Sequence, residues 1–98
     1  MEIKKVVWDK VVLSDLEDIF EYLKPKPEVS SKIVPTLIKL VFELSNNFEI
    51  YSLDRFKINN DGSYRAFEKY HYRISYKILP NEIRILRIRH TSRNPKEY

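Results

Sequence analysis

Residues 72–90 hold the feature that most restricts how this chain can fold. Apolar and polar side chains alternate over residues 72–78, which is the period of a strand with one buried face. Pro80 and Asn81 suit the two central positions of a tight turn. Residues 83–90 should then return as a second strand, and their apolar side chains on both parities indicate a central strand with both faces covered. The fold must therefore contain an antiparallel hairpin in its C-terminal third.

The register of this hairpin decides which polar side chains share a face. Pairing Leu79 with Glu82 across the turn predicts that Arg73 lies opposite Ile88 and diagonal to His90, on the face away from the core. The same pairing places these pairs on the core face: Tyr76 with Ile85, and Ile78 with Ile83. A slip of one residue would invert the assignment, so the predicted face depends on the register.

The N-terminal half predicts a strand followed by a helix. Residues 3–12 are rich in β-branched and aromatic side chains, which favours a first strand. Ser14 and Glu17 match a capping box, so the helix should begin at Ser14. Its apolar residues recur at helical spacing as far as Leu23, and Pro25 ends it.

A second helix is expected to run to about Asn46 and to form a hairpin with the first. Pro35 leaves two starts open, because proline lacks the N–H that a helix interior needs. The helix begins near Pro35, or it begins near Glu28 and kinks at Pro35. Two amphipathic helices joined by a short proline-rich link favour a helical hairpin packed on a sheet.

The order of elements gives the expected fold class, which is α+β. We predict an N-terminal strand, a two-helix hairpin and then antiparallel strands that together form one mixed sheet. Residues 59–63 are a clear turn, residues 64–69 are a short strand, and residues 51–57 suit either a strand or an ordered loop. A length of 98 residues suits one domain, residues 1–98, with one core.

Charge is divided unevenly between the two halves of the chain. Residues 1–49 carry 7 Lys and 9 acidic residues, a net −2, whereas residues 50–98 carry 11 Lys and Arg and 5 acidic residues, a net +6. All seven arginines lie between Arg55 and Arg93. A basic half predicts an anionic partner, either a nucleic acid or an acidic protein, and the alternative is a solvated sheet face.

Composition excludes several kinds of site. The chain has no cysteine and one glycine, so thiolate metal sites, disulfides and glycine-rich phosphate loops are ruled out. Its two histidines have no acidic cluster beside them, so we expect no metal and no cofactor. It has no apolar run of the roughly 20 residues that span a bilayer and no signal-peptide core, which predicts a cytoplasmic protein without membrane contact.

The basic half also contains a candidate site for RNA. Metal-free RNA cleavage needs a general base, a general acid and cations that stabilise the phosphorane charge. The candidate catalytic residues are Arg73, His90, Arg93 and Tyr98. The candidate residues for binding nucleic acid or another target are Arg65, Arg73, Arg89 and Arg93. The tail from Thr91 to Tyr98 is polar and basic and is expected to curl over the same face.

Each of these residues also has a purely structural alternative. His90 suits a hydrogen-bonded structural histidine, and Arg73 suits a solvated sheet arginine. Tyr72 and Tyr76 are expected in the core because their parity places them inside. Tyr98 stands at the end of the tail, where side chains are often disordered.

Three ordered motifs resemble the RelE/ParE family of bacterial type II toxins, of the plasmid-stabilisation type. They are Tyr64-Arg65, then Tyr72-Arg73-Ile74-Ser75-Tyr76, then an apolar strand that ends in His90-Thr91-Ser92-Arg93. The resemblance covers essentially the whole chain and implies the fold described above. It also implies a cognate antitoxin as partner, in a hetero-oligomer, and an acidic antitoxin tail would account for the basic half.

The resemblance leaves the activity divided between two branches of the family. The ParE-like branch inhibits DNA gyrase, and the strand that ends in His90-Thr91-Ser92-Arg93 is closer to that pattern. The RelE-like branch consists of metal-independent endoribonucleases that cut mRNA on the translating ribosome, and Arg73, Arg93 and Tyr98 are similar to its site residues. The lysines that this branch often carries on the preceding strand are replaced here by residues such as Tyr64 and Ala66. A third possibility is an inactive homologue that retains only antitoxin binding. We favour gyrase inhibition.

Overall fold

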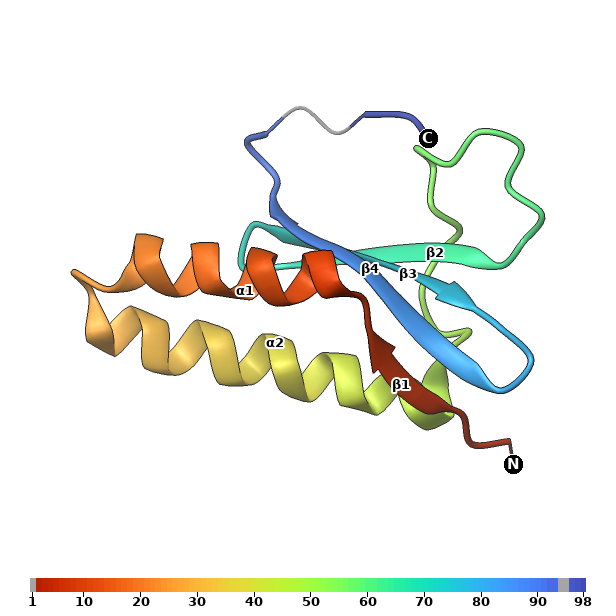
Figure 1. The fold of residues 1–98 in the computed structure, drawn as a ribbon, viewed down its shortest axis with the longest axis horizontal. Coiled ribbons are helices and arrows are strands. Elements are labelled where there is room, and N and C mark those ends of the chain that lie inside the picture. The colour runs from red at the N-terminus through yellow and green to blue at the C-terminus, as the bar shows by residue number, and fades with distance from the viewer. Residues whose placement is uncertain (1, 94–95) are drawn as a thin grey trace.

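A four-stranded mixed sheet with a helical hairpin packed on it forms the architecture (Figure 1). The computed structural model describes residues 2–93 and 96–98. In chain order the elements are β1 (Lys5–Trp8), α1 (Lys10–Leu23), α2 (Pro27–Asn47), β2 (Tyr64–Lys69), β3 (Tyr72–Ile78) and β4 (Glu82–His90). The strand order is β1-β4-β3-β2, with β1 parallel to β4 and the other neighbours antiparallel. The predicted α+β class, with one mixed sheet, is confirmed.

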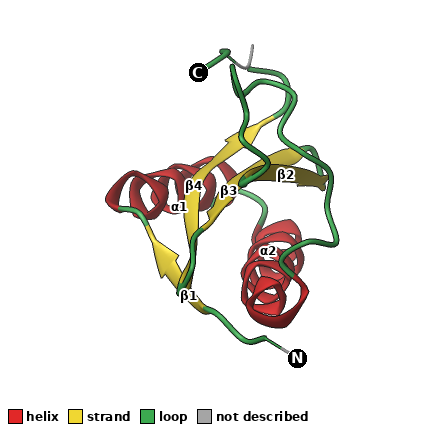
Figure 2. Cartoon of the chain, turned by 90° about the vertical axis from the view of Figure 1, so that its right-hand side faces the viewer, coloured by secondary structure: helices red, strands yellow, loops and turns green. Residues whose placement is uncertain are grey.

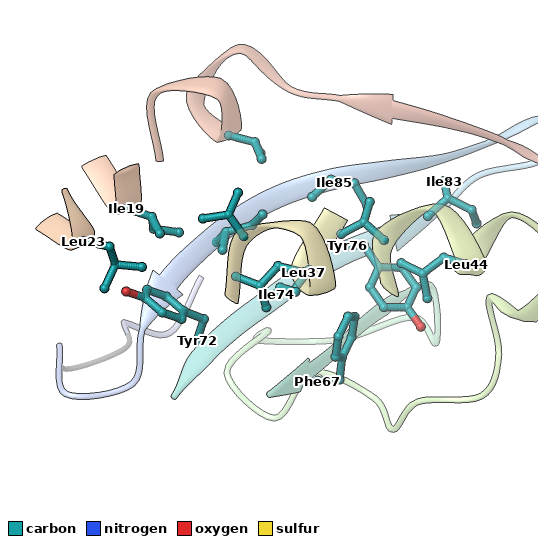
Figure 3. Close-up of a cluster of buried hydrophobic side chains, with 14 residues drawn as sticks. Ile19, Leu23, Leu37, Leu44, Phe67, Tyr72, Ile74, Tyr76, Ile83 and Ile85 are labelled. Carbon is teal, nitrogen blue, oxygen red and sulfur yellow. The ribbon is translucent and has the colours of Figure 1, made fainter. Parts of the chain in front are cut away.

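The core lies between the helical hairpin and one face of the sheet (Figure 3). The helices contribute Val12, Ile19, Leu23, Val34, Leu37, Val41 and Leu44, and the sheet contributes Phe67, Tyr72, Ile74, Tyr76, Ile83, Ile85 and Ile88. Tyr76 is fully buried, and its hydroxyl donates a hydrogen bond to the Phe48 carbonyl at 2.7 Å. Tyr72 and Tyr76 therefore lie in the core, as their parity predicts.

The β3–β4 hairpin has the predicted register only beside the turn. Tyr76 pairs with Ile85 as expected, but Ser75 pairs with Arg87, so Leu86 is an extra residue on β4. Such a β-bulge shifts every later pair by one residue. The prediction that Arg73 lies opposite Ile88 is therefore wrong, because Arg73 pairs with Arg89.

The bulge also exchanges the side chains on the two faces of β4. Ile88, which we expected on the open face, is buried in the core opposite Ile74. Arg87 and Arg89 take its place on the open face, beside Ser75 and Arg73. The bulge therefore adds two arginines to a face that was expected to carry Ile88 and His90.

The first helix begins four residues earlier than Ser14, so the predicted capping box is wrong. β1 covers only Lys5–Trp8, and Asp9 is the N-cap residue, without a side-chain cap. Val12 was expected in the strand but lies in the helix, where it is fully buried in the core. Burial of this side chain outweighs the local preference for a strand. Ser14 is exposed on the helix surface.

The second helix takes the earlier of its two expected starts. It begins at Pro27, where proline costs nothing because the first N–H groups of a helix have no partner within it. Pro35 lies inside the helix. Residues 48–63 form a loop with one bridge from Leu53 to Arg65, so the ordered-loop alternative is correct. The predicted turn at residues 59–63 is present, where the Asn60 and Asp61 side chains accept hydrogen bonds from the N–H groups of Gly62 and Ser63.

Helix α1 covers an edge of β4 that β1 leaves open. β1 pairs only with residues 82–85 of β4, and α1 lies beside the rest of that strand (Figure 2). The buried Asp15 carboxylate accepts the Ile88 backbone N–H at 2.9 Å. It also accepts two hydrogen bonds from the Arg87 guanidinium, both at 2.9 Å. Asp15 thus supplies an acceptor where the neighbouring strand is missing.

Over the described ranges, neither helix is long and apolar enough to pass through a membrane.

Candidate functional site

A cavity of about 480 Å³ lies on the face of the sheet that the helices leave open. Strands β3 and β4 supply Arg73, Ser75, Leu86, Arg87, Arg89 and His90. The loop before β2 and the first residue of β2 supply Asp54, Phe56 and Tyr64, and the C-terminal segment supplies Thr91, Arg93, Lys96 and Tyr98. We call this space the basic cavity. Asn94 and Pro95 of the expected tail lie outside the described residues.

Positive charge dominates the lining of the basic cavity. Its cations are Arg73, Arg87, Arg89, Arg93 and Lys96. Asp54 is the one acidic side chain among the lining residues that the structure describes. Two of the arginines are already paired, Arg73 with Asp54 and Arg87 with Asp15. The other three cations have no ion pair within residues 2–93 and 96–98.

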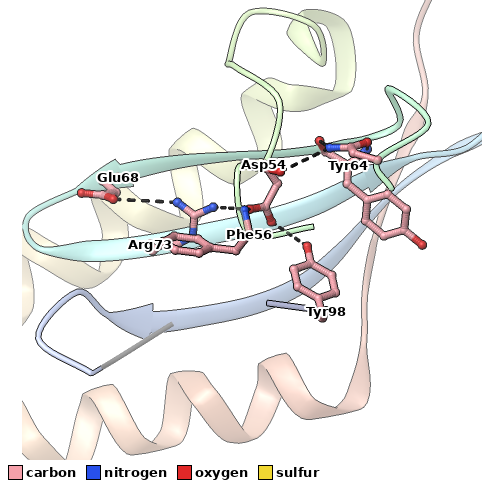
Figure 4. A network of polar contacts seen from close by, with 7 residues as sticks. Asp54, Phe56, Tyr64, Glu68, Arg73 and Tyr98 are labelled. Carbon is pink, nitrogen blue, oxygen red and sulfur yellow. Dashed lines mark hydrogen bonds and ion pairs between the residues drawn. The ribbon is translucent and has the colours of Figure 1, made fainter. Parts of the chain in front are cut away.

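Asp54 is the centre of a polar network at one end of this cavity (Figure 4). Its side chain is 1% exposed, and one oxygen accepts hydrogen bonds from the Arg73 guanidinium and from the Phe56 N–H. The other oxygen accepts the Tyr98 hydroxyl at 2.6 Å. The Arg73 guanidinium also stacks on the Phe56 ring, 4.7 Å from its centroid, and lies 3.8 Å from Glu68. Arg73 is therefore neutralised within the chain.

Tyr98 is anchored through its backbone as well as its hydroxyl. Its N–H donates to the Phe56 carbonyl at 2.9 Å, and its carbonyl accepts the Ile58 N–H at 2.6 Å. Its ring packs edge-on against Tyr64 at 5.9 Å between centroids. These contacts attach the C-terminal segment to the loop before β2, so Tyr98 is held in place and is not a disordered terminus.

The environment of Tyr98 determines what its hydroxyl can do. Burial, and then the hydrogen bond to Asp54, raise the pKa of the Tyr98 hydroxyl well above its usual value of 10.0. The hydroxyl is therefore protonated at neutral pH and acts as a donor to Asp54. A neutral phenol that already donates its proton to a carboxylate is a poor general base for RNA cleavage.

His90 lies at the end of β4 and reaches only the border of the basic cavity. Contrary to our expectation, it does not stand diagonal to Arg73 on the open face, because Arg73 pairs with Arg89. The bulge pairs His90 with Tyr72, and the two rings meet edge-on at 5.2 Å between centroids. Its Nδ1 accepts the Ser92 N–H at 3.1 Å and lies 2.7 Å from the Ser92 hydroxyl. His90 borders both the basic cavity and a smaller cavity of about 150 Å³ beside α1. These contacts give His90 a structural role at the start of the C-terminal segment.

The structure gathers most, but not all, of the candidate residues at one place. Arg73, Arg89, His90, Arg93 and Tyr98 line the basic cavity. Arg65 does not line it, because its guanidinium donates to the carbonyls of Glu49 and Tyr51, at 3.2 and 2.7 Å. Arg65 therefore holds the loop that follows α2 and is not available to a target in this conformation.

Sequence reasoning missed Asp54 and Lys96. Asp54 is the residue that neutralises Arg73, but it lies in a loop without periodicity, so no pattern marks it as buried. Lys96 is one of several polar residues in the tail, and only the anchoring of Tyr98 brings it to the cavity. Across the ranges 2–93 and 96–98, no group of three His, Asp or Glu side chains is arranged to hold a metal ion.

Raised tyrosine pKa values predict that the protein unfolds at alkaline pH. The pKa values of Tyr51, Tyr72, Tyr76 and Tyr98 are all raised, with burial as the first cause in each case. A pKa raised by folding gives stability that is complete below the unfolded value near 10 and is lost as pH rises further. Urea midpoints should therefore fall above about pH 10, and this fall should be smaller in Tyr98→Phe. The matched control is Tyr22→Phe, which changes an exposed tyrosine; an equal reduction in both variants would contradict the assignment.

The comparisons with known proteins agree with this fold. A family model described as the ParE toxin of the type II toxin–antitoxin system parDE matches residues 6–95. Eight chains of solved structures match. One of them, from the chromosomal ParDE toxin–antitoxin system of P. aeruginosa, is 20% identical with a TM-score of 0.71. That alignment covers 90% of this chain and 96% of the other. No curated protein matches this chain.

Proposed function

Since this chain belongs to the ParE toxin family of type II toxin–antitoxin systems, we propose that it inhibits DNA gyrase and that a cognate antitoxin neutralises it. The family is the ground for the antitoxin and for gyrase as the target. We further propose that residues 1–98 act as one domain in the cytoplasm, where gyrase works, and form a hetero-oligomer with the antitoxin.

One observation carries the choice of gyrase inhibition over RNA cleavage. Two of the three residues that are similar to a RelE-like site, Arg73 and Tyr98, are held by Asp54, whereas Arg93 has no ion pair among residues 2–93 and 96–98. RNA cleavage without a metal needs an unpaired cation for the phosphorane and a group that can accept a proton. A paired Arg73 and a protonated Tyr98 supply neither, so a RelE-like site here would lack two of its three residues. This arrangement supports a protein that acts by binding.

The exposed surface of the helical hairpin also supports action by binding. Leu13, Phe20 and Phe42 are 53%, 51% and 54% exposed. A groove of about 820 Å³ runs between the two helices and is lined in part by Phe20, Val34 and Ile38. Large exposed apolar side chains are typical of surfaces that bind other proteins, and aromatic side chains often dominate the binding free energy.

The test is to express this chain in bacteria without its antitoxin and to measure DNA breaks and mRNA ends in the same cells. We expect growth arrest, gyrase-linked DNA breaks and an SOS response, while mRNA ends stay unchanged. New mRNA ends at ribosome-occupied codons that disappear in Arg73→Ala would overturn the proposal in favour of a ribosome-dependent endoribonuclease. No growth effect would point to an inactive homologue that retains only antitoxin binding.

A further inference from the structure

The basic cavity holds positive charge that the rest of the chain does not neutralise. Arg89, Arg93 and Lys96 line it without an ion pair among residues 2–93 and 96–98. Arg93 and Lys96 are exposed, and Tyr98 anchors the segment that carries them to the loop before β2. Three cations that converge on one cavity attract a compact anion that carries several negative charges.

Arg87 adds a guanidinium whose direction is already fixed. Its Nε and Nη2 donate to the two carboxylate oxygens of Asp15, both at 2.9 Å, which leaves Nη1 for a ligand. The Arg87 side chain is 40% exposed and lines the cavity, so a ligand can reach it. A guanidinium that is held in advance loses little conformational freedom on binding, and its planar set of donors matches the oxygens of a phosphate. The lining therefore favours phosphate groups.

The same cavity has apolar surface beside its cations. Leu86, the extra residue of the β-bulge, lines the cavity, and so do the rings of Phe56 and Tyr64. Ser75 adds a hydroxyl group to the lining from β3. A ligand that fills the cavity should therefore join its phosphates to a flat apolar group through a part that can form hydrogen bonds, as a nucleotide does.

The size of the cavity favours a small ligand over a polynucleotide strand. A volume of about 480 Å³ lies within the range of roughly 300–1,000 Å³ that ligand pockets have. A strand gains its affinity from cations that follow the phosphates along an open surface. Here the cations converge on one cavity that β4 and the C-terminal segment border. One nucleotide with several phosphates therefore fits this arrangement better than a strand.

We propose that the basic cavity binds a nucleoside triphosphate. Arg87 and Arg89 contact the phosphates from β4. Arg93 and Lys96 contact them from the C-terminal segment, and Leu86 packs against the base. The inference does not depend on gyrase inhibition, because the cavity lies on the open face of the sheet and the surface that supports gyrase binding lies on the helical hairpin.

The first test measures binding of ATP, inorganic triphosphate and adenosine to the purified chain by isothermal titration calorimetry. ATP should saturate a single site and bind at least roughly tenfold more tightly than triphosphate or adenosine, because only ATP meets both the cations and the apolar lining. A short single-stranded DNA is titrated in parallel and should bind more weakly than ATP.

A double variant tests the cations of the C-terminal segment. Arg93→Ala with Lys96→Ala removes two exposed side chains that have no ion pair within the described ranges, so the fold should stay intact. ATP binding should weaken at least roughly tenfold. The matched control is Arg84→Ala with Lys69→Ala, which also removes one arginine and one lysine, neither of which lines the cavity. It should change the affinity less than about twofold, and thermal unfolding checks that both variants are folded.

A single variant tests the position of the base. Leu86→Ala removes apolar surface from the cavity, so ATP binding should weaken roughly threefold to tenfold. Binding of inorganic triphosphate should stay unchanged, because triphosphate has no base. Equal losses for ATP and triphosphate would contradict the placement of the base against Leu86.

Several outcomes would overturn the inference as a whole. They are no saturable binding of ATP by the wild type, triphosphate that binds as tightly as ATP, and equal losses of ATP binding in the two charge-matched double variants. Single-stranded DNA that binds more tightly than ATP, and loses this affinity in Arg93→Ala with Lys96→Ala, would assign the cavity to a strand instead. None of these titrations contains gyrase, so their failure leaves the proposed function standing.

Discussion

Replacing Asp15 by alanine is expected to lower the free energy of unfolding by about 2–4 kcal/mol. The substitution removes both acceptors of the Arg87 guanidinium and the acceptor of the buried Ile88 N–H. The Arg87 side chain is 40% exposed, so water can solvate part of its guanidinium once Asp15 is removed. The expected loss of stability is therefore smaller than for breaking a fully buried ion pair. Tm should fall by roughly 10–25 °C, as expected for a domain of this size.

Two further substitutions show whether the geometry of Asp15 is the reason. Asp15→Asn keeps an acceptor for the Ile88 N–H but removes the charge that faces Arg87, so its loss of stability should be intermediate. Asp18 follows Asp15 by three residues on the same helix, and its carboxylate is exposed. Asp18→Ala should therefore change the free energy of unfolding by no more than about 0.5 kcal/mol. If Asp15→Ala and Asp18→Ala are equally mild, α1 does not depend on Asp15 for its attachment to β4.

Replacing Asp54 by alanine is the second change with a large expected effect, about 2–4 kcal/mol. It leaves the Arg73 guanidinium, which is 16% exposed, without its main partner, and it removes the acceptors of the Tyr98 hydroxyl and the Phe56 N–H. Urea unfolding measures the loss. The control is Glu68→Ala, because Glu68 is a half-exposed carboxylate 3.8 Å from the same guanidinium, and its loss should cost at most about 1 kcal/mol.

A double variant tests whether Asp54→Ala loses stability because the Arg73 charge is left without its partner. Asp54→Leu combined with Arg73→Met removes both charges and keeps apolar side chains at both positions. Replacing a whole buried ion pair by apolar side chains is often close to neutral, whereas removing one partner is strongly destabilising. The double variant should therefore be more stable than Asp54→Ala, and a double variant that is less stable would contradict this account.

The sequence predicts which helices and strands form better than it predicts the register in which the strands pair. The alternation over residues 72–78 and the Pro80-Asn81 turn correctly predict the hairpin, because period and turn chemistry are local properties. The bulge at Leu86 is not visible in that pattern, because Leu86 is apolar and fits a strand on either face. Because this one extra residue was missed, the sequence analysis placed Ile88 on the wrong face of the sheet and did not place Arg87 and Arg89 on the open face.

The start of α1 is a second feature that local sequence signals could not predict. Ser14 and Glu17 have the spacing of a capping box, but the contact that decides the start of α1 is distant in sequence. Val12 is fully buried against the core, and Asp15 bonds to β4, 73 residues further along the chain. Local signals near residue 14 carry no information about either contact.

The candidate site was predictable as a set of basic residues and not as a network. Parity and charge correctly placed Arg73 on the open face, and of the described residues of the tail, Thr91, Arg93, Lys96 and Tyr98 line the cavity on that face, as expected. The loop that carries Asp54 has no periodicity, so the neutralisation of Arg73 follows only from the three-dimensional structure. The sequence alone therefore could not decide whether Arg73 is free to bind phosphate.

The most direct test of the account is a supercoiling assay with purified gyrase and this purified chain. We predict that supercoiling is inhibited at concentrations comparable to that of the enzyme, that cleaved DNA accumulates, and that the same preparation leaves mRNA on translating ribosomes intact. Unaffected supercoiling together with cleavage of ribosome-bound mRNA would contradict the central claim.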